Sequence, residues 1–209
     1  MPPVPARSFP LTAEELTLVC EIVGLGEPLG VGLLPLDHDD AVARELMLAT
    51  SLRSLAGRGL LAVDGDGEVE LDPVLTSTIE LLAGAPCGVS IRATGEESSA
   101  DIALAFDEGR CSVLVQRGLL DYSVYAFTSV ADVDLLAYAL AQTFLSAAQG
   151  MVVATRVDSD GVRGEELAWR AVEDGKVEVS SPAVLGGENG DAPSTLAPAE
   201  LAARLIGAA

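Results

Sequence analysis

The chain contains one histidine, His38, and this limits the chemistry that it can perform. A metal site with two histidines, an H-E-x-x-H helix or a C₂H₂ zinc site cannot be built from a single imidazole. A Ser-His-Asp hydrolase would use His38 as its base, but the sequence has no G-x-S-x-G turn to present the serine. We therefore expect neither these metal sites nor nucleophilic catalysis of this kind.

His38 lies in an acidic stretch, with Asp37 before it and Asp39 and Asp40 after it. These carboxylates and a backbone carbonyl could hold a hard cation, but their spacing matches no calcium-binding loop. The simpler interpretation is the start of a helix, where the positive end of the helix dipole stabilises carboxylates. No metal and no cofactor are expected.

Glycine-rich phosphate loops are absent from the sequence, although it has 21 glycines. Gly24, Gly26 and Gly30 have the wrong spacing for a nucleotide-binding turn, and they follow a predicted helix instead of a strand.

With 32 acidic residues in the chain, adjacent acids are expected on solvated faces. We expect no enzymatic activity, and catalysis by acidic residues alone stays an open alternative. The acid pairs are Glu96/Glu97, Glu165/Glu166 and Asp158/Asp160.

The charge of the chain argues against nucleic acid and membrane partners. With 12 basic and 32 acidic residues, the formal net charge is −20. Such a surface repels the phosphates of nucleic acids and the headgroups of anionic lipids.

Three features predict a cytoplasmic location without membrane insertion. Cys20, Cys87 and Cys111 are odd in number, widely spaced and form no C-x-x-C pair, which is typical of thiols in a reducing compartment. The N-terminal MPPVPARSFP has prolines where a secretory signal needs an apolar run. The apolar stretch 130–148 is interrupted by polar residues, which fits a buried helix better than a membrane span.

The N-terminal part is predicted to be helical with one hairpin. Thr12 and Glu15 form a capping-box pattern at the start of the first helix. A D-G-D-G turn between two short apolar segments predicts the hairpin, and Pro73 suits the first position of the helix that follows. The expected elements are helices over residues 12–24, 37–57 and 73–83 and strands over 60–63 and 69–71.

From Gly88 onwards the apolar pattern changes from helical spacing to a period of two. Ile102, Leu104 and Phe106 alternate with other residues, and short turns join the segments, so an antiparallel meander is expected. A helix over 129–148 should cover the sheet. The expected strands are 89–93, 101–106, 111–116, 122–128, 151–156, 166–172 and 176–180, followed by a loop over 186–194 and a helix over 198–206.

Together these elements predict an α+β fold with a central antiparallel β-sheet flanked by helices. Residues 1–86 form a helical, winged-helix-like N-terminal part, and residues 87–209 form the antiparallel sheet with its covering helices, in one compact unit. The winged outline does not indicate DNA binding, because residues 1–83 hold four basic and fourteen acidic residues. We expect a structural or protein-binding module.

The order of elements resembles the EspG family, the cytosolic chaperones of type VII (ESX) secretion systems. The matching stretches are LTAEEL in the first helix, LRSLAGRGLLAVDGDGEVELDPVL across the hairpin, TIELLAGAP in the third helix and GVSIRAT in the sheet. The resemblance covers roughly residues 8–150.

This resemblance implies a mixed fold around a central sheet, no enzymatic activity, and binding of helical secretion substrates before export. Members of the family are usually longer and end in a helical bundle that contributes to substrate binding, whereas one short predicted helix ends this sequence. We therefore expect an atypically short relative with a reduced or different substrate surface. Its expected partner is a helical protein, PE/PPE-like or WxG-like.

Tyr122, Tyr125 and Trp169 are the candidate partner-binding residues, because aromatic side chains are enriched at interface hot spots. The favoured interpretation, however, is that these few aromatic side chains fill the core. The leading hypothesis is a non-catalytic chaperone or adaptor, since an acidic surface suits a basic or amphipathic partner segment. The alternative is an acidic winged-helix-like regulatory or ligand-sensing module that does not bind DNA directly.

Overall fold

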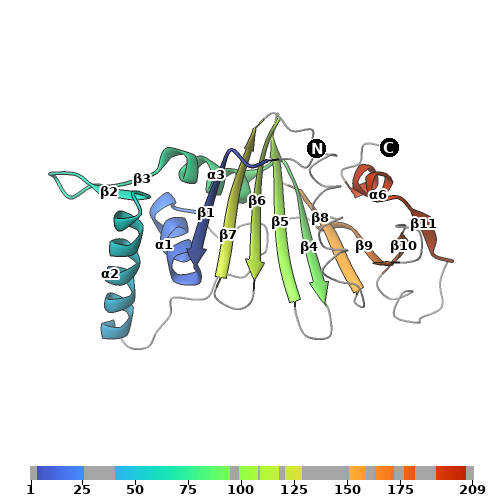
Figure 1. The fold of residues 1–209 in the computed structure, drawn as a ribbon, viewed down its shortest axis with the longest axis horizontal. Coiled ribbons are helices and arrows are strands. Elements are labelled where there is room, and N and C mark those ends of the chain that lie inside the picture. Colours follow the sequence, from blue (N-terminus) through green and yellow to red (C-terminus); the bar gives the residue numbers. More distant parts are fainter. Residues whose placement is uncertain are drawn as a thin grey trace.

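The computed structural model describes residues 4–25, 41–94, 99–107, 109–117, 121–128, 151–158, 163–171, 177–181 and 192–205. Its centre is a nine-stranded sheet in which the strand order is β1-β7-β6-β5-β4-β8-β9-β10-β11. Four helices are described, and the strands fan out between α1 and α2 at one end and α6 at the other (Figure 1). The predicted α+β fold with a central antiparallel sheet is confirmed.

The middle of the sheet is the predicted four-stranded meander. β4 (Cys87–Thr94), β5 (Ser99–Asp107), β6 (Arg110–Arg117) and β7 (Asp121–Thr128) pair with one another in chain order, all antiparallel. Gly109 in the turn between β5 and β6 has a φ of 80°, a conformation that glycine adopts without a steric penalty. The meander prediction is therefore confirmed in both its strands and its pairing.

The later strands extend the sheet from the opposite side of the meander. β8 (Met151–Asp158) pairs with β4, the first strand of the meander, and β9 (Arg163–Ala171) and β10 (Val177–Ser180) follow in order. β11 (Ser194–Leu196) pairs with β10 and was not predicted, because it begins in the stretch 186–194, whose glycine, asparagine, aspartate and proline residues indicate a loop.

β1 (Arg7–Thr12) corrects the expectation that the residues before the first helix form only a proline-rich lead. The strand pairs antiparallel with β7 and lies at the edge of the sheet, where Pro10 is tolerated because no second neighbour needs its missing N–H. Phe9 and Leu11 point into the core and are 1% and 4% exposed. This alternation was hidden by Pro10, which argues against a strand in sequence reasoning.

α1 (Ala13–Val23) begins at the predicted capping box. The N–H of Glu15 donates to the Thr12 hydroxyl oxygen at 3.3 Å, and the Glu15 carboxylate accepts from the N–H of Thr12 at 3.0 Å. Gly24 ends the helix in the left-handed conformation, with a φ of 74°. Leu16, Val19 and Cys20 form its buried side.

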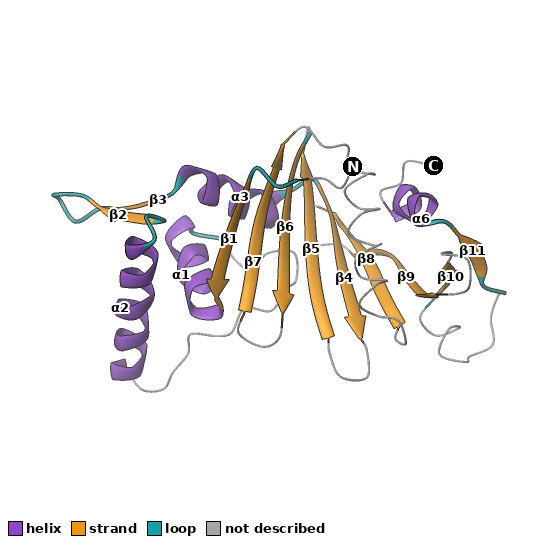
Figure 2. Ribbon diagram, viewed as in Figure 1, coloured by secondary structure: helices purple, strands orange, loops and turns teal. Residues whose placement is uncertain are grey.

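The elements that follow α1 appear in the predicted order. α2 (Ala41–Gly57) leads into β2 (Leu61–Val63) and β3 (Val69–Leu71), which pair as a hairpin, and α3 (Pro73–Gly84) begins with Pro73 at its first turn. α2 packs against α1, whereas α3 crosses the sheet over β5, β6 and β7 (Figure 2).

The side chains of the sheet divide into two buried clusters, one on each face. On β5, Ile102, Leu104 and Phe106 belong to the first cluster, and Ala103 and Ala105 belong to the second. α1 and α3 cover the second cluster, while α6 (Pro198–Leu205), close to its predicted bounds, contributes three residues to the first. They are Leu201, Ala202 and Leu205.

Several predictions lie outside the described residues. They include the acidic stretch around His38, the helix over 129–148 and most of the loop over 186–194. The division into parts 1–86 and 87–209 stays a prediction, and β1 joins the first of these parts to the sheet of the second. None of the helices that the structure describes is long and apolar enough to span a membrane.

Candidate protein-binding surface

Tyr122 lies on β7, on the face that α1 and α3 cover. Its neighbours in the sheet are Leu11 on β1 and Gln116 on β6, and it is 3% exposed. Burial, followed by the negative charge of Asp101, raises the pKa of its hydroxyl, so the group stays protonated over the physiological range. The structure therefore places Tyr122 in the second cluster.

Trp169 occupies the centre of β9, on the other face of the sheet. It lies between Val152 on β8 and Val179 on β10 and is 0% exposed. The side chain is among the largest that are fully buried, and it belongs to the first cluster. This position agrees with the favoured interpretation of the aromatics as core residues.

Tyr125 is the only one of the three candidates that is partly exposed. It lies on β7 opposite Val113 of β6 and packs against the first cluster. Tyr125 and Trp169 share a face but are separated by the strands β6, β5, β4 and β8, and Tyr122 points to the opposite face. The structure thus does not bring the three aromatics together, and their role in partner binding stays a prediction.

A polar area covers the half of the second face that α1 and α3 leave uncovered. On β4, Ser90 lies opposite the buried Ala103 of β5, and beyond it follow Thr155 on β8 and Glu166 on β9. Because directly opposite residues share a face, this face continues across β4, β8, β9 and β10 with half-exposed and exposed polar residues around the fully buried Ala168. We call this area the polar sheet face; it consists of Ser90, Arg92, Thr155, Glu166, Arg170 and Glu178.

Two cross-strand ion pairs organise the polar sheet face. Arg92 Nε donates to Asp101 Oδ1 at 2.8 Å, and Arg170 Nε donates to Glu178 Oε2 at 2.6 Å. The hydrogen bond to Asp101 raises the pKa of Arg92 further. The arginine side chains remain 69% and 55% exposed, so they are accessible to a partner protein.

Sequence reasoning missed the polar sheet face because its six residues come from four strands. The signal was present in each strand, since Arg92 follows Ile91 and Arg170 follows Trp169, and each arginine therefore points away from a buried neighbour. The missing information was the pairing of β8 with β4, which no local pattern reveals.

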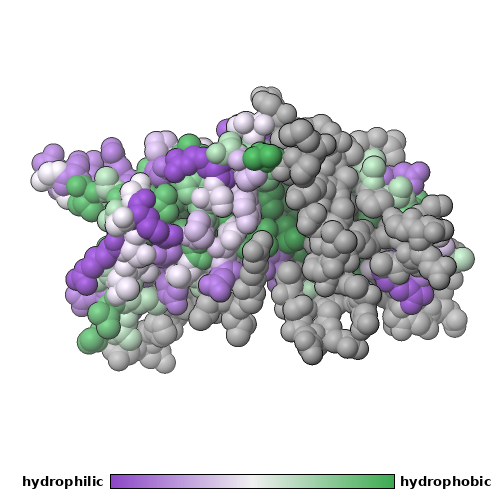
Figure 3. Space-filling model, viewed as in Figure 1, coloured by the Kyte–Doolittle hydropathy of each residue, from purple (hydrophilic) through white to green (hydrophobic). Residues whose placement is uncertain are grey.

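A second exposed area lies at the end of the molecule formed by α2 and the β2–β3 hairpin. Five large hydrophobic residues are exposed among those described, and four of them lie here: Val42 and Leu46 on α2, and Val63 and Val69 on the hairpin. Figure 1 shows the hairpin extending away from the sheet, and Figure 3 shows hydrophobic surface on the same end of the molecule. Val42 and Leu46 lie at the start of α2 and the two valines lie beyond its end, so the pair on the hairpin is considered separately below.

An arginine at the end of α2 fixes this end of the molecule to the sheet. Arg58 Nη2 lies 2.7 Å from the Glu15 carboxylate, whose side chain is only 5% exposed. Arg58 Nη1 also donates to the backbone carbonyl of Pro10 on the edge strand β1. One side chain therefore joins α2, the start of α1 and the edge of the sheet.

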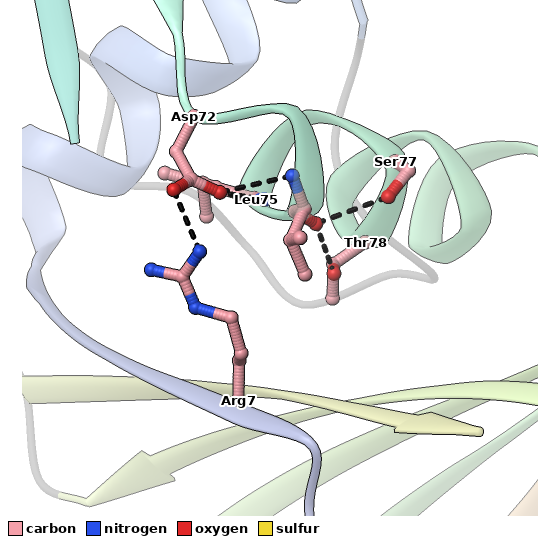
Figure 4. Close-up of polar contacts among 6 residues, drawn as sticks. Arg7, Asp72, Leu75, Ser77 and Thr78 are labelled. Carbon is pink, nitrogen blue, oxygen red and sulfur yellow. Dashed lines mark hydrogen bonds and ion pairs between the residues drawn. The ribbon is translucent and has the colours of Figure 1, made fainter.

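Asp72 fixes the base of the hairpin in a similar way (Figure 4). Its N–H donates to the Leu60 carbonyl across the base, and its carboxylate accepts from the N–H groups of Val74 and Leu75 at the start of α3. Arg7 of β1 donates to the other carboxylate oxygen at 2.7 Å. Burial acts to raise the pKa of Asp72, but the bonds from Arg7, Leu75 and Val74 lower it overall.

The described residues were also searched for metal ligands and reactive thiols. Within the ranges given above, no three His, Cys, Asp or Glu side chains lie close enough to hold a metal ion. The three cysteines form no disulfide, and burial raises the pKa of Cys20 to about 11, so its thiol is not activated. Ion-paired arginines, exposed valines and acids suit contacts with another protein.

Comparison with known proteins yields a structural similarity. No protein-family model and no curated protein matches the chain. The structure of the Mycobacterium tuberculosis type VII secretion system chaperone EspG5 in complex with the PE25-PPE41 dimer is similar, with a TM-score of 0.56 and 11% sequence identity. The alignment covers 96% of this chain and 95% of that chain. The expected EspG-like fold is confirmed, and the likeness extends beyond the stretch 8–150 that carries the sequence motifs.

Proposed function

We propose that this protein is a non-catalytic chaperone or adaptor that binds a helical protein substrate of a type VII secretion system. The observation that carries the proposal is the similarity to EspG5 over 96% of the chain, because EspG5 was solved with a PE25-PPE41 dimer bound. A shared fold at 11% identity supports a shared kind of partner and no particular contact residue. The proposed partner is accordingly PE/PPE-like or WxG-like.

The polar sheet face is the proposed substrate surface. It is broad, lies on a rigid sheet, and presents arginines that are already oriented by their pairs with Asp101 and Glu178. Of the three aromatics, Tyr125 is proposed as a direct contact with the substrate on the other face of the sheet. Tyr122 and Trp169 would act indirectly, by packing in the core and stabilising the strands that carry these surfaces.

Co-purification with a PE–PPE-type pair or a WxG-type dimer tests the proposal. We expect a stoichiometric complex in size-exclusion chromatography with light scattering. The Arg92→Glu/Arg170→Glu variant should weaken binding about tenfold or more, because it reverses the charge of the two proposed contact residues. The matched control is Arg53→Glu, which reverses an exposed arginine on α2. Absence of a complex with every such substrate would contradict the proposal.

The second candidate is an acidic winged-helix-like regulatory or ligand-sensing module. It is favoured by the unit of helix, projecting hairpin and helix formed by α2, β2–β3 and α3 (Figure 1). The acids of the hairpin oppose phosphate contacts, so no retention on heparin or duplex DNA is expected at low salt. A rise in melting temperature with a small molecule, without any protein partner, would favour this candidate.

We also propose a cytoplasmic location. It rests on the reduced state of Cys20, Cys87 and Cys111 and on the acidic composition. Cell fractionation with an epitope-tagged chain tests it, and recovery in the membrane or secreted fraction would contradict it.

A further inference from the structure

The β2–β3 hairpin has one apolar face and one acidic face. Leu61 lies opposite Leu71 and Val63 lies opposite Val69, so these four side chains share a face, while Glu70 lies opposite Ala62 on the other. The segment 61–71 holds four acids and no basic residue. The hairpin is thus amphipathic, although its strands have only three residues each.

The apolar face begins in the core and ends in solvent. Leu61 is 5% exposed and belongs to the second cluster, and Leu71 packs against that cluster. Two residues further along each strand, Val63 is 58% exposed and Val69 is 39% exposed. The core of the molecule therefore continues along the hairpin as an apolar stripe that no described residue covers at its outer end.

The hairpin is built to hold this shape. Asp64 Oδ1 accepts from the N–H groups of Asp66 and Glu68, each at 2.9 Å, and Gly67 adopts a φ of 85°. Its base is fixed by Asp72 and Arg58, as described above. An isolated two-stranded hairpin is marginal in water, so these bonds stabilise an element that would otherwise fray. Its exposed valines are therefore held in a defined position.

We propose that the outer part of the β2–β3 hairpin is a docking site for a basic amphipathic helix of a partner protein. The apolar side of that helix would extend the stripe by covering Val63 and Val69. Its flanking lysines or arginines would reach Asp66 and Glu68 near the turn, and Glu70 around the edge of the two-stranded ribbon. These three acids form no ion pair with any basic residue in the described part of the chain. Charge complementarity selects this occupant, because a negatively charged hairpin repels nucleic acid and acidic helices alike.

The exposed apolar area is small, so binding at this site is weak and reversible. A stable protein interface buries about 1,600 Å² in total, far more than two valines and their neighbours provide. The site therefore suits a transient contact that is steered by charge and depends strongly on salt. It lies on a different element from the polar sheet face, and substrate binding there would not block it.

The test uses the full chain and a fluorescent synthetic helix of about five turns, with leucine on one side and lysine on the other. Binding is followed by fluorescence anisotropy and located by chemical-shift changes in ¹H–¹⁵N NMR spectra. One variant removes the apolar contact, Val63→Ser/Val69→Ser, and a second removes the charge, Asp66→Asn/Glu68→Gln/Glu70→Gln. The matched control, Glu21→Gln/Glu80→Gln/Asp121→Asn, removes three exposed acids elsewhere. Thermal unfolding verifies that all variants are folded.

We expect micromolar binding at about 0.05 M salt, with the largest shift changes in residues 62–70. Each hairpin variant should bind about tenfold more weakly, and the control should bind within about twofold of the unchanged chain. Absence of binding, equal loss in the control, or unchanged binding by the hairpin variants would each overturn the proposal. The assay involves no secretion substrate, so its failure and failure of the proposed function are distinguishable.

Discussion

The sheet and the end formed by α2 and the hairpin differ in how much of their apolar surface is covered. In the sheet, large side chains are completely buried on both faces, such as Trp169 in the first cluster and Leu114 in the second. At the α2–hairpin end, Leu55 and Leu61 are buried in the second cluster, but apolar residues such as Leu46 and Val63 are exposed. The side chains of Arg58 and Arg7 add polar connections to this end. The sheet is thus built for rigidity, and the α2–hairpin end presents surface that other proteins can contact.

The largest expected effect is in the sheet. Trp169→Ala should lower the free energy of unfolding by about 3–5 kcal/mol, because it leaves a cavity in a fully buried site. Val63→Ala on the hairpin should change it by less than about 0.5 kcal/mol, because that side chain is exposed. Urea unfolding followed by far-ultraviolet circular dichroism measures both. Similar losses for the two substitutions would contradict the contrast between the regions.

The next largest effect concerns Arg58, which connects the α2–hairpin end to the sheet. Arg58→Ala should cost about 2 kcal/mol, because it leaves the carboxylate of Glu15 buried without its cation. Arg53→Ala, an exposed arginine on the same helix, is the control and should cost less than about 0.5 kcal/mol. Hydrogen exchange should also show faster opening of α2 in the Arg58 variant. Equal stabilities of the two variants would show that Arg58 does not fix α2 to the sheet.

A smaller effect depends on pH through Asp72. The pKa of its carboxyl is lowered in the folded state, so it contributes stability that is complete above its ordinary pKa near 4 and is lost as the pH falls through the lowered value. Asp72→Asn keeps a capping side chain but removes the ion pair with Arg7, and should cost about 0.5–1 kcal/mol at pH 7. The difference from the unchanged chain should shrink as the pH approaches 3, in unfolding measured at several pH values.

The control for Asp72 is Asp66→Asn in the hairpin turn, since Asp66 forms no ion pair within the described ranges and is exposed. We expect this substitution to change the free energy of unfolding at pH 7 by less than about 0.5 kcal/mol. A difference between Asp72→Asn and the unchanged chain that stayed constant down to pH 3 would show that the ionised carboxylate is not the stabilising species.

The smallest effect concerns the reactivity of the cysteine thiols, which reports on the packing of the second cluster without any substitution. Cys20 is 1% exposed, and burial raises the pKa of its thiol to about 11, so at pH 8 it is both covered and protonated. The half-buried Cys87 should react with a thiol reagent first, and the buried Cys20 and Cys111 only after unfolding. Mass spectrometry of the labelled peptides assigns each site. Early labelling of Cys20 in the native protein would contradict the packing of α1.

Local signals in the sequence were sufficient for most elements. The capping box at Thr12 and Glu15 and the alternation of Ile102, Leu104 and Phe106 each involve residues close together in the chain, so they predicted a helix start and a strand correctly. β1 was missed because Pro10 is acceptable only in an edge strand, and the sequence does not state which strands lie at an edge.

The candidate surfaces depend on pairings between distant segments, and these could not be predicted locally. The polar sheet face exists because β8 pairs with β4 and not with β7. The apolar stripe on the hairpin could in principle have been predicted from the sequence, since Leu61 and Val63 alternate with Ala62. The exposure of its outer end, however, depends on how far the hairpin extends from the core. Burial of Tyr122 and Trp169 likewise depends on the layers above them.

The most direct test of the proposed function is binding to a purified type VII substrate dimer, measured by isothermal titration calorimetry. The account predicts one substrate dimer per chain and loss of binding in the Arg92→Glu/Arg170→Glu variant, with binding retained by Arg53→Glu. Absence of heat and of complex with PE–PPE-type and WxG-type dimers alike, with the chain folded, would contradict it.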